Sequence, residues 1–456
     1  MAQGVIFMKL VNYLRSTGGT AVSDTGPFRL LTTVLGVLSF SMLLAGCDSD
    51  GGTSLSDEIT DQIQTDTEQA VVQRFGLSVS RDTNPQSDEA TRTEVIDSFN
   101  NLSLQLLREH GDAQPEANTI NSGYSLAIAM SMLQRASAGV DFTLIQQILG
   151  VSAIEEVDFY TAVNAIDLDI ESRSNDGLDL RSANSLFIKP DFPLETEFLD
   201  VMTTQFDAPV FEADFEAEPV AVKEAINDWA SDNTNGLIPN LLSQPLPANS
   251  VLALLNATLL DAKWEDEYTD VNDFEFTTAD GGVLSVPGFR GESSHQYLRT
   301  EEALSVSIEY EGSDVSLMII MPEDIETYTA NLTASKIAQR HADSQSVYMA
   351  LTVPNWTTKS SIDFSQLPMT SGLAGRALDM SRLSQSGNCC EINTFKQEAM
   401  IEVDKDGTRA AAVTIIGVGT TAVRIPEVVN IDQPFLFFVR DEPTDLILFS
   451  GSVLNP

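Results

Sequence analysis

The residue types that most often carry chemistry in enzymes are scarce in this chain of 456 residues. Its three histidines, His110, His295 and His341, are far apart in sequence and lack the H-E-x-x-H spacing of a zinc hydrolase. The chain also has no G-x-S-x-G nucleophile elbow and no G-x-x-x-x-G-K-S/T phosphate loop. We therefore expect each histidine to be a surface residue or a hydrogen-bonded core residue. The sequence predicts neither an enzyme nor a bound metal or cofactor.

Two of the three cysteines, Cys389 and Cys390, are neighbours in sequence. A disulfide between adjacent residues forces a strained ring, so two free thiols are expected and a vicinal disulfide is the alternative. Neither cysteine has other metal-ligand residues at a suitable spacing. The third cysteine, Cys47, belongs to a different pattern, described below.

The most informative stretch runs from Glu402 to Thr414 and reads EVDKDGTRAAAVT. An acidic turn containing glycine leads into small side chains among which Arg409 is the one charge, and no further charge or proline follows until Arg424. Exposed loops usually carry polar and turn-forming residues, so this run favours a strand that must fit between neighbours. On such a strand Thr408 points inward with every second residue after it, while Arg409 points outward. An ordinary central strand would give the same pattern.

The rest of the chain decides between these readings. Its tail reads QPFLFFVRD from Gln433 and ILFSGSVLNP from Ile447, and further segments follow a fixed order before it. Together they resemble the serpins over residues 94–456. The segments that carry the resemblance are Phe99–Leu107, Asn118–Gly139, Leu180–Phe187, Ile226–Leu242 and Asn256–Trp264. The resemblance implies an α+β serpin fold, with a large mixed central β-sheet, further sheets, about eight or nine helices and an exposed reactive-centre loop.

In serpins, a serine, an asparagine and a histidine form a hydrogen-bonded network beneath the main sheet where it opens, and a central strand ends in a buried tryptophan. The matching residues here are Ser122, Asn256, Gln397 and Trp264. Gln397 replaces the histidine, but an amide also donates and accepts, so we expect the network to persist.

Three further positions depart from the family pattern. Gly123 follows Ser122 where the family usually has proline, and Lys405 and Arg409 replace two usual glutamates. On the two-residue alternation described above, the side chain of Arg409 points outward. For Lys405, the sequence does not decide whether the change from glutamate weakens the anchoring of the loop in the intact protein.

The family mechanism offers the exposed loop to a protease as a substrate. After acylation, the cleaved loop inserts into the main sheet as an extra strand, and the protease is carried to the far end and distorted. This mechanism requires small, uncharged side chains where the loop enters the sheet, since a buried unpaired charge would cost several kcal/mol. The implied hinge consists of Gly407, Thr408, Ala410, Ala411, Ala412 and Thr414.

The position of the reactive bond follows from counting along the loop. Fifteen residues from Gly407 give Thr421-Ala422, whereas counting back from Pro434 gives Val423-Arg424. Both choices place a small or β-branched side chain in the specificity pocket of the protease. We therefore expect an elastase-like or subtilisin-like target. A loop longer by three residues would instead present Arg424 to a trypsin-like enzyme.

The N-terminal region predicts export. Residues 1–46 carry a few basic residues and then an uncharged run from Leu30 to Leu44, which is typical of a signal peptide. Leu44-Ala45-Gly46-Cys47 resembles a bacterial lipobox, so Cys47 is the expected lipid attachment site, and an N-terminal anchor helix is the alternative. Asp48 resembles a signal for retention in the inner membrane. Residues 47–93 are polar and acidic and predict a flexible tether.

The net charge of −42 makes a nucleic-acid partner implausible, because phosphate binding requires a basic face. It also suggests a marine or halophilic source, since salt screens the self-repulsion of such a chain, and an acidic protein of no special habitat is the alternative. We expect a monomeric cell-envelope lipoprotein on the periplasmic or surface side, with the membrane undetermined. Its expected function is suicide inhibition of serine proteases, with cysteine proteases also open. A non-inhibitory serpin acting as chaperone, carrier or protease substrate, and an unrelated ligand-binding lipoprotein, are the alternatives.

Overall fold

The computed structural model describes residues 72–74, 79–385, 390–391, 395–408 and 425–456. The chain separates into two units, residues 1–68 and residues 69–456, and every described residue belongs to the second. Within the described ranges, no helix combines the length and the apolar character needed to cross a membrane.

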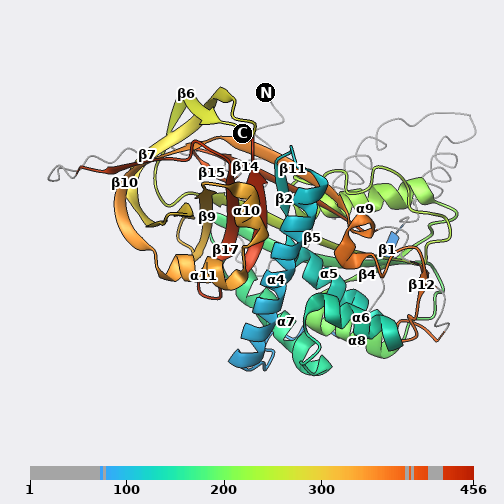
Figure 1. Ribbon diagram of the computed structural model, residues 1–456. Helices are drawn as coiled ribbons and strands as arrows, with labels where there is room; N and C mark the ends of the chain where they lie inside the picture. The colour runs from blue at the N-terminus through green and yellow to red at the C-terminus, as the bar shows by residue number, and fades with distance from the viewer. Residues whose placement is uncertain (1–71, 75–78, 386–389, 392–394, 409–424) are drawn as a thin grey trace, which may run out of the picture. The chain divides into compact units, whose positions relative to one another are not determined.

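The main sheet has seven strands among the described residues, in the order β1-β4-β3-β5-β15-β14-β11 (Figure 1). β3 and β4 are parallel and the other neighbours are antiparallel, so the sheet is mixed. Its strands are β1 (Val72–Arg74), β3 (Leu178–Ile188), β4 (Val210–Ala213), β5 (Leu252–Lys263), β11 (Trp356–Asp363), β14 (Lys396–Asp404) and β15 (Gly407–Thr408).

A second sheet has nine strands in the described part of the chain, in the order β16-β10-β7-β8-β9-β17-β18-β2, with β6 paired to β7. Its strands are β2 (Thr119–Asn121), β6 (Thr269–Thr277), β7 (Val283–Arg299), β8 (Ala303–Glu309), β9 (Val315–Pro322), β10 (Gln345–Pro354), β16 (Glu427–Asn430), β17 (Phe435–Asp441) and β18 (Ile447–Val453). Two short strands, β12 (Ala377–Leu378) and β13 (Cys390–Glu391), pair with each other.

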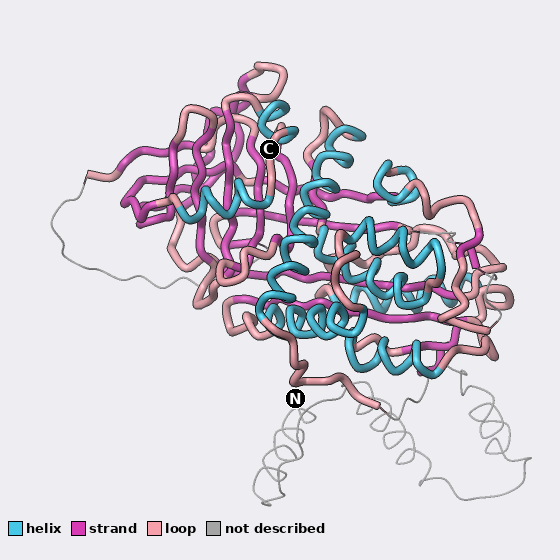
Figure 2. Tube along the Cα trace, turned by 60° about the horizontal axis from the view of Figure 1, so that its bottom comes forward, coloured by secondary structure: helices cyan, strands magenta, loops and turns pink. Residues whose placement is uncertain are grey.

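The described residues form eight α-helices, which gather mainly over the strands at the right of Figure 2. Their bounds are α4 (Glu89–Ala113), α5 (Gly123–Ala136), α6 (Gly139–Leu149), α7 (Glu156–Glu171), α8 (Thr196–Phe206), α9 (Pro219–Asn233), α10 (Ile325–Ala330) and α11 (Ala334–Ala342). Two 3-10 turns, Phe364–Gln366 and Pro368–Thr370, follow β11.

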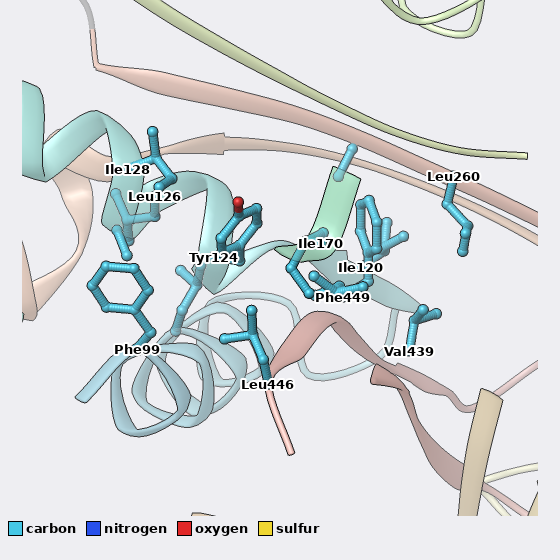
Figure 3. Packing of buried hydrophobic residues seen from close by; sticks show 14 of the residues in the cluster. Phe99, Ile120, Tyr124, Leu126, Ile128, Ile170, Leu260, Val439, Leu446 and Phe449 are labelled. Carbon is cyan, nitrogen blue, oxygen red and sulfur yellow. The ribbon is translucent and has the colours of Figure 1, made fainter. Parts of the chain in front are cut away.

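The apolar tail of the sequence forms the strand β17, which is buried on both faces. Phe435, Phe437 and Val439 pack into the largest apolar cluster, while Leu436 and Phe438 pack on the other face against a smaller one. A strand covered on both faces reads as a continuous apolar run instead of an alternating one. Figure 3 shows part of the larger cluster, to which the helices contribute Phe99 and Tyr124 and the strands contribute Val439 and Phe449.

The close approach of α4 and α5 explains one departure from the family sequence. A Cβ atom at Gly123 would lie well inside van der Waals distance of Ser103, including its backbone Cα. Ser103 is fully buried on α4. A proline at position 123 would therefore push the two helices apart, and glycine permits this packing.

The structure differs from the expected tether at its C-terminal end. α4 begins at Glu89, where Asp88 caps the helix by accepting a hydrogen bond from the Thr91 amide. Residues 79–88 make contacts with α7 and α8, and β1 pairs with β4 at the edge of the main sheet. The polar composition of this segment concealed these contacts because most of them are hydrogen bonds and ion pairs.

Candidate functional site

The candidate site begins at the hairpin between β14 and β15. The strands are joined by the two-residue turn Lys405-Asp406, and Gly407 then enters the main sheet with φ at +150°. A Cβ atom at Gly407 would clash with the carbonyl oxygen of Ala262 and would lie 2.9 Å from the Cα of Lys263. Only glycine allows the chain to approach β5 this closely.

Thr408 occupies a position between two strands of the main sheet. It pairs with Ala262 on β5 and with Val403 on β14, and only 2% of the residue is exposed. Its Oγ1 atom lies 2.6 Å from the hydroxyl oxygen of Tyr310. The inward direction expected for Thr408 matches this placement, and a hydroxyl partner satisfies its polar atom.

An aromatic pair fixes the entrance to this position. The rings of Tyr310 and Trp264 stack with centroids 4.9 Å apart and planes at 7°. Trp264 also donates its Nε1 hydrogen to the carbonyl oxygen of Asp404 at 2.8 Å. One aromatic residue therefore holds the chain before the turn, and the other holds it after the turn.

Beyond Thr408 the two flanking strands continue without a described partner between them. In the described part of the chain, β5 pairs only with β3 and β15, and β14 only with β11 and β15. A cavity of about 320 Å³ lies along this gap. Side chains from both strands and from α5 line it, including Leu126, Asn256, Gln397, Ala399 and Thr408.

Ser122 and Gln397 form a reciprocal pair at the base of the gap. The Ser122 amide donates to Gln397 Oε1 at 3.0 Å, and Gln397 Nε2 donates to the Ser122 carbonyl at 2.9 Å. The Ser122 hydroxyl donates to the Leu448 carbonyl at 2.7 Å and also caps α5. The amide of Gln397 thus supplies both a donor and an acceptor to one backbone residue.

Asn256 joins this group through a residue that the sequence analysis missed. Ser125, on the first turn of α5, donates its hydroxyl hydrogen to Asn256 Oδ1. Asn256 Nδ2 in turn donates to Asn184 Oδ1 at 2.8 Å and contacts Ser182 Oγ at 3.4 Å. A serine three residues after a helix cap is common, so its spacing alone gives no signal of this role.

Trp264 lies away from the other three residues of the expected network. It follows the C-terminal end of β5, eight residues after Asn256, which corresponds to about 26 Å along an extended strand. The structure therefore brings Ser122, Gln397 and Asn256 together at one level of the gap, and places Trp264 at the hairpin. Tyr310, the partner of Trp264, is distant in sequence, and no local pattern marks it.

Lys405 forms an ion pair within the hairpin turn itself. Its Nζ atom lies 2.7 Å from both carboxylate oxygens of Asp406. The hydrogen bond to Asp406 raises the pKa of Lys405, and the nearby charges of Asp270 and Asp404 add to this effect. The lysine is thus held by acidic neighbours on a half-buried turn.

Several expected site residues lie outside the described residues. These are Cys47, Cys389, Ala410, Ala411, Ala412, Thr414, Thr421, Ala422, Val423 and Arg424. Cys390 belongs to the short strand β13. Arg409 also lies outside the described residues.

The three histidines lie on different elements. His110 is on α4 and His295 on β7, where burial lowers the pKa of both, and His341 is on α11. Among the described residues, no hydrogen-bond partner is found for the buried Nδ1 atoms of His110 and His341, which differs from the expected surface or hydrogen-bonded core histidine. Within the described ranges, no group of three or more His, Cys, Asp or Glu side chains is placed to hold a metal ion.

The family model described as "Serpin (serine protease inhibitor)" matches residues 97–456. Human neuroserpin is 26% identical over 372 residues, which cover 78% of this chain and 90% of the relative. An uncharacterised serpin-like protein of Thermococcus kodakarensis is 25% identical over 377 residues, which cover 81% of this chain and 87% of the relative.

Solved serpin structures share the fold. The native state of the thermophilic serpin tengpin matches with a TM-score of 0.73 and 23% identity, covering 84% of this chain and all of that chain. Human thyroxine-binding globulin with thyroxine matches with a TM-score of 0.72 and 20% identity, covering 80% of this chain and 99% of that chain. The α+β fold predicted from the sequence is confirmed, and the chain belongs to the serpin family.

Proposed function

We propose that this protein is a suicide inhibitor of serine proteases that traps the acyl-enzyme by inserting its cleaved loop between β5 and β14, with cysteine proteases also open as targets. The observation that carries the proposal is the position of Thr408. The first inward residue after the turn already lies between these two strands, at one end of a gap that continues along both. Serpins are generally protease inhibitors, which supports the same conclusion.

The pairing of Thr408 also sets the register that an inserted strand would take. A strand that continues from Thr408 would pass one residue of β5 and one of β14 at each step. Ala410 would then lie between Leu260 and Ile401. These large apolar neighbours leave room only for a small side chain. Thr414 would lie between Asn256 and Gln397, so its hydroxyl would enter the polar part of the gap.

Insertion would supply backbone hydrogen bonds to both strands that border the gap. Each net hydrogen bond contributes roughly 0.5–1.5 kcal/mol, and burial of apolar area contributes about 25 cal/mol per Å². A strand of several residues therefore stabilises the sheet by many kcal/mol in total. This free energy is available to deform a protease that remains bound to the moving end of the loop.

Incubation with a panel of serine proteases, followed by denaturing electrophoresis, tests the proposal. A covalent band is expected with an elastase-like or subtilisin-like enzyme, at the summed mass of both proteins less the C-terminal fragment that cleavage releases. Clean cleavage without that band would favour the alternative, a non-inhibitory serpin acting as chaperone, carrier or protease substrate. The thyroxine-binding globulin structure, which holds thyroxine, shows that the fold accommodates a carrier.

Thr408→Arg sharpens the test. The variant must bury a guanidinium between β5 and β14 or stay out of the sheet, so it should be cleaved without forming the covalent band. Thr357→Arg is a matched control, because Thr357 lies on the neighbouring strand β11 with an exposed side chain. Covalent complex at the parental stoichiometry with Thr408→Arg would overturn the insertion mechanism.

We also propose Thr421-Ala422 as the reactive bond, with Val423-Arg424 as the alternative. Mass spectrometry of the C-terminal fragment released from the complex tests the register. A fragment that begins at Ala422 supports the preferred bond, and one that begins at Arg424 supports the alternative. A fragment that begins at Ile425 would point to trypsin-like targets instead.

For the cellular location, we propose export and lipid attachment at Cys47, with residues after it serving as a tether. The support is the sequence Leu44-Ala45-Gly46-Cys47 after an apolar run. Cys47→Ser removes the sulfur that a thioether requires, so the variant should leave the membrane fraction or remain unprocessed. Membrane fractionation that gave the same result for both proteins would exclude lipid attachment at this residue.

A further inference from the structure

A buried arginine from the N-terminal segment occupies an acidic site on α7. We name residues 79–88 the strap. Within it, Arg81 Nη2 lies 2.7 Å from Asp167 Oδ2, and Nη1 lies 3.0 Å from Glu171 Oε2. Arg81 Nε donates to Asn164 Oδ1 at 2.8 Å. All three partners are on α7, and only 9% of the Arg81 side chain is exposed.

Backbone contacts keep the strap in this position. The Asp82 amide donates to the Thr204 carbonyl at 2.9 Å, and Asn164 Nδ2 donates to the Asp82 carbonyl at 2.7 Å. Asn164 therefore contacts both the side chain of Arg81 and the backbone of the next residue. A guanidinium that uses all three nitrogens on one helix is a specific docking arrangement.

The acidic partner of Arg81 also binds the first turn of α5. Asp167 Oδ1 accepts a hydrogen bond from the hydroxyl of Tyr124, which is fully buried among apolar side chains (Figure 3). Burial raises the pKa of the Asp167 carboxyl, and the charge of Arg81 opposes that rise. Without Arg81, this carboxyl would remain in the core without the positive charge that opposes its desolvation.

The first turn of α5 touches both strands that border the gap. Ser122 is paired with Gln397 on β14, and Ser125 is bonded to Asn256 on β5. Tyr124 lies between these two serines in sequence. Three residues within one helical turn therefore connect β14, the acidic site on α7 and β5.

We propose that Arg81 is a positioning residue for sheet opening: through Asp167 and Tyr124 it fixes the first turn of α5, which restrains the separation of β5 and β14. Separation of these strands requires the bonds of Ser122 or Ser125 to break or the turn to move. An ordered strap makes the turn harder to move, so the intact protein opens more slowly. The inference deepens the proposed function, because loop insertion requires this opening.

Hydrogen exchange of the full-length protein, followed by mass spectrometry of peptides, tests the proposal without any protease target. In Arg81→Ala, amides of β5 and β14 should exchange about tenfold faster, which corresponds to about 1.4 kcal/mol of opening free energy. Arg92→Ala is the matched control, because Arg92 of α4 also pairs with a carboxylate of α7, Asp169, at 3.5 Å, but the two side chains are 35% and 50% exposed. Its exchange at β5 and β14 should match that of the parent protein.

Two further measurements separate positioning from general stability. Low millimolar guanidinium chloride should slow the exchange of Arg81→Ala again by filling the acidic site, whereas sodium chloride at equal ionic strength should not. Tyr124→Phe should accelerate exchange in β5 and β14 while the strap stays protected, since it removes the link and leaves the Arg81 contacts. Because Tyr124→Phe leaves the Arg81 contacts in place, it still tests the proposal if Arg81→Ala fails to fold.

Two exchange results would contradict the proposal. Faster exchange confined to the strap and α7 in Arg81→Ala, or parental exchange at β5 and β14 in Tyr124→Phe, would overturn the proposal. Failure of the proposed function would appear separately, as the absence of covalent complex with parental protein. The exchange results for the variants do not depend on that outcome.

Discussion

The hydroxyl oxygen of Tyr310 lies 2.6 Å from Oγ1 of Thr408, and both residues are buried. Tyr310 follows β8 and Thr408 ends β15, so two segments 98 residues apart meet at the point where the gap begins. This contact holds the first residue of the loop at the entrance to the sheet.

Tyr310→Phe should weaken the seating of Thr408 while keeping the aromatic stack on Trp264. The buried threonine hydroxyl loses its partner, which costs roughly 1–3 kcal/mol if the residue stays in place. We expect the melting temperature to fall by a few degrees and more inhibitor to be consumed per protease trapped. A double-mutant cycle with Thr408→Val measures the coupling, and strictly additive effects would show that the contact is energetically unimportant.

Gly407→Ala should displace β15 from the sheet. The new methyl group would clash with the Ala262 carbonyl, and φ at +150° is a conformation that alanine strongly disfavours. Near-ultraviolet circular dichroism of Trp264, which stacks on Tyr310 and contacts Asp404, should report the movement. Gly111→Ala on α4 is the control, since nothing lies within 4 Å of its Cβ and the helix should tolerate alanine. Equal spectra for both variants would contradict the clash.

Arg409→Glu should slow insertion. The register set by Thr408 would bring residue 409 between Asp261 on β5 and Glu402 on β14, so an arginine meets opposite charges and a glutamate meets like charges. The expected result is a higher inhibitor-to-protease stoichiometry at low salt, which should fall toward the parental value as salt screens the repulsion. Arg409→Gln, which removes the charge only, should lie between the two. An unchanged stoichiometry for Arg409→Glu would argue for a different register.

Gln397→Glu should destabilise the intact protein in a pH-dependent way. A carboxylate can replace the amide oxygen but leaves the Ser122 carbonyl without a donor, whereas the protonated acid can donate. The pKa of the new carboxyl is therefore raised in the folded state, so its stability penalty is smallest at low pH and grows as pH rises through that pKa. Thermal melts of the variant and parent between about pH 4 and 8 measure it. Gln345→Glu, on an exposed part of β10, should show no such trend.

The sequence predicted those parts of the site that follow a local pattern. The inward direction of Thr408 came from the two-residue alternation of a strand. The network of Ser122, Asn256 and Gln397 came from the resemblance to the serpins, and the donor and acceptor capacity of an amide explained why glutamine could replace the histidine. Tyr310 and Ser125 were missed because their roles depend on tertiary contacts that no local spacing encodes. Arg81 was missed because a single arginine in a polar segment looks the same whether it is solvated or buried against carboxylates.

The hydrogen bond from Trp264 to the Asp404 carbonyl should respond to salt much less than the stability of the whole protein does. The chain carries 67 acidic and 25 basic residues, so its stability should depend strongly on ionic strength. The pair between Lys405 and Asp406 is only half-buried, so the same ions weaken it. The indole donates to a neutral carbonyl and is 5% exposed, so salt screens this bond very little. The resting position of the loop entrance should therefore stay constant across salinities that change the stability of the whole molecule.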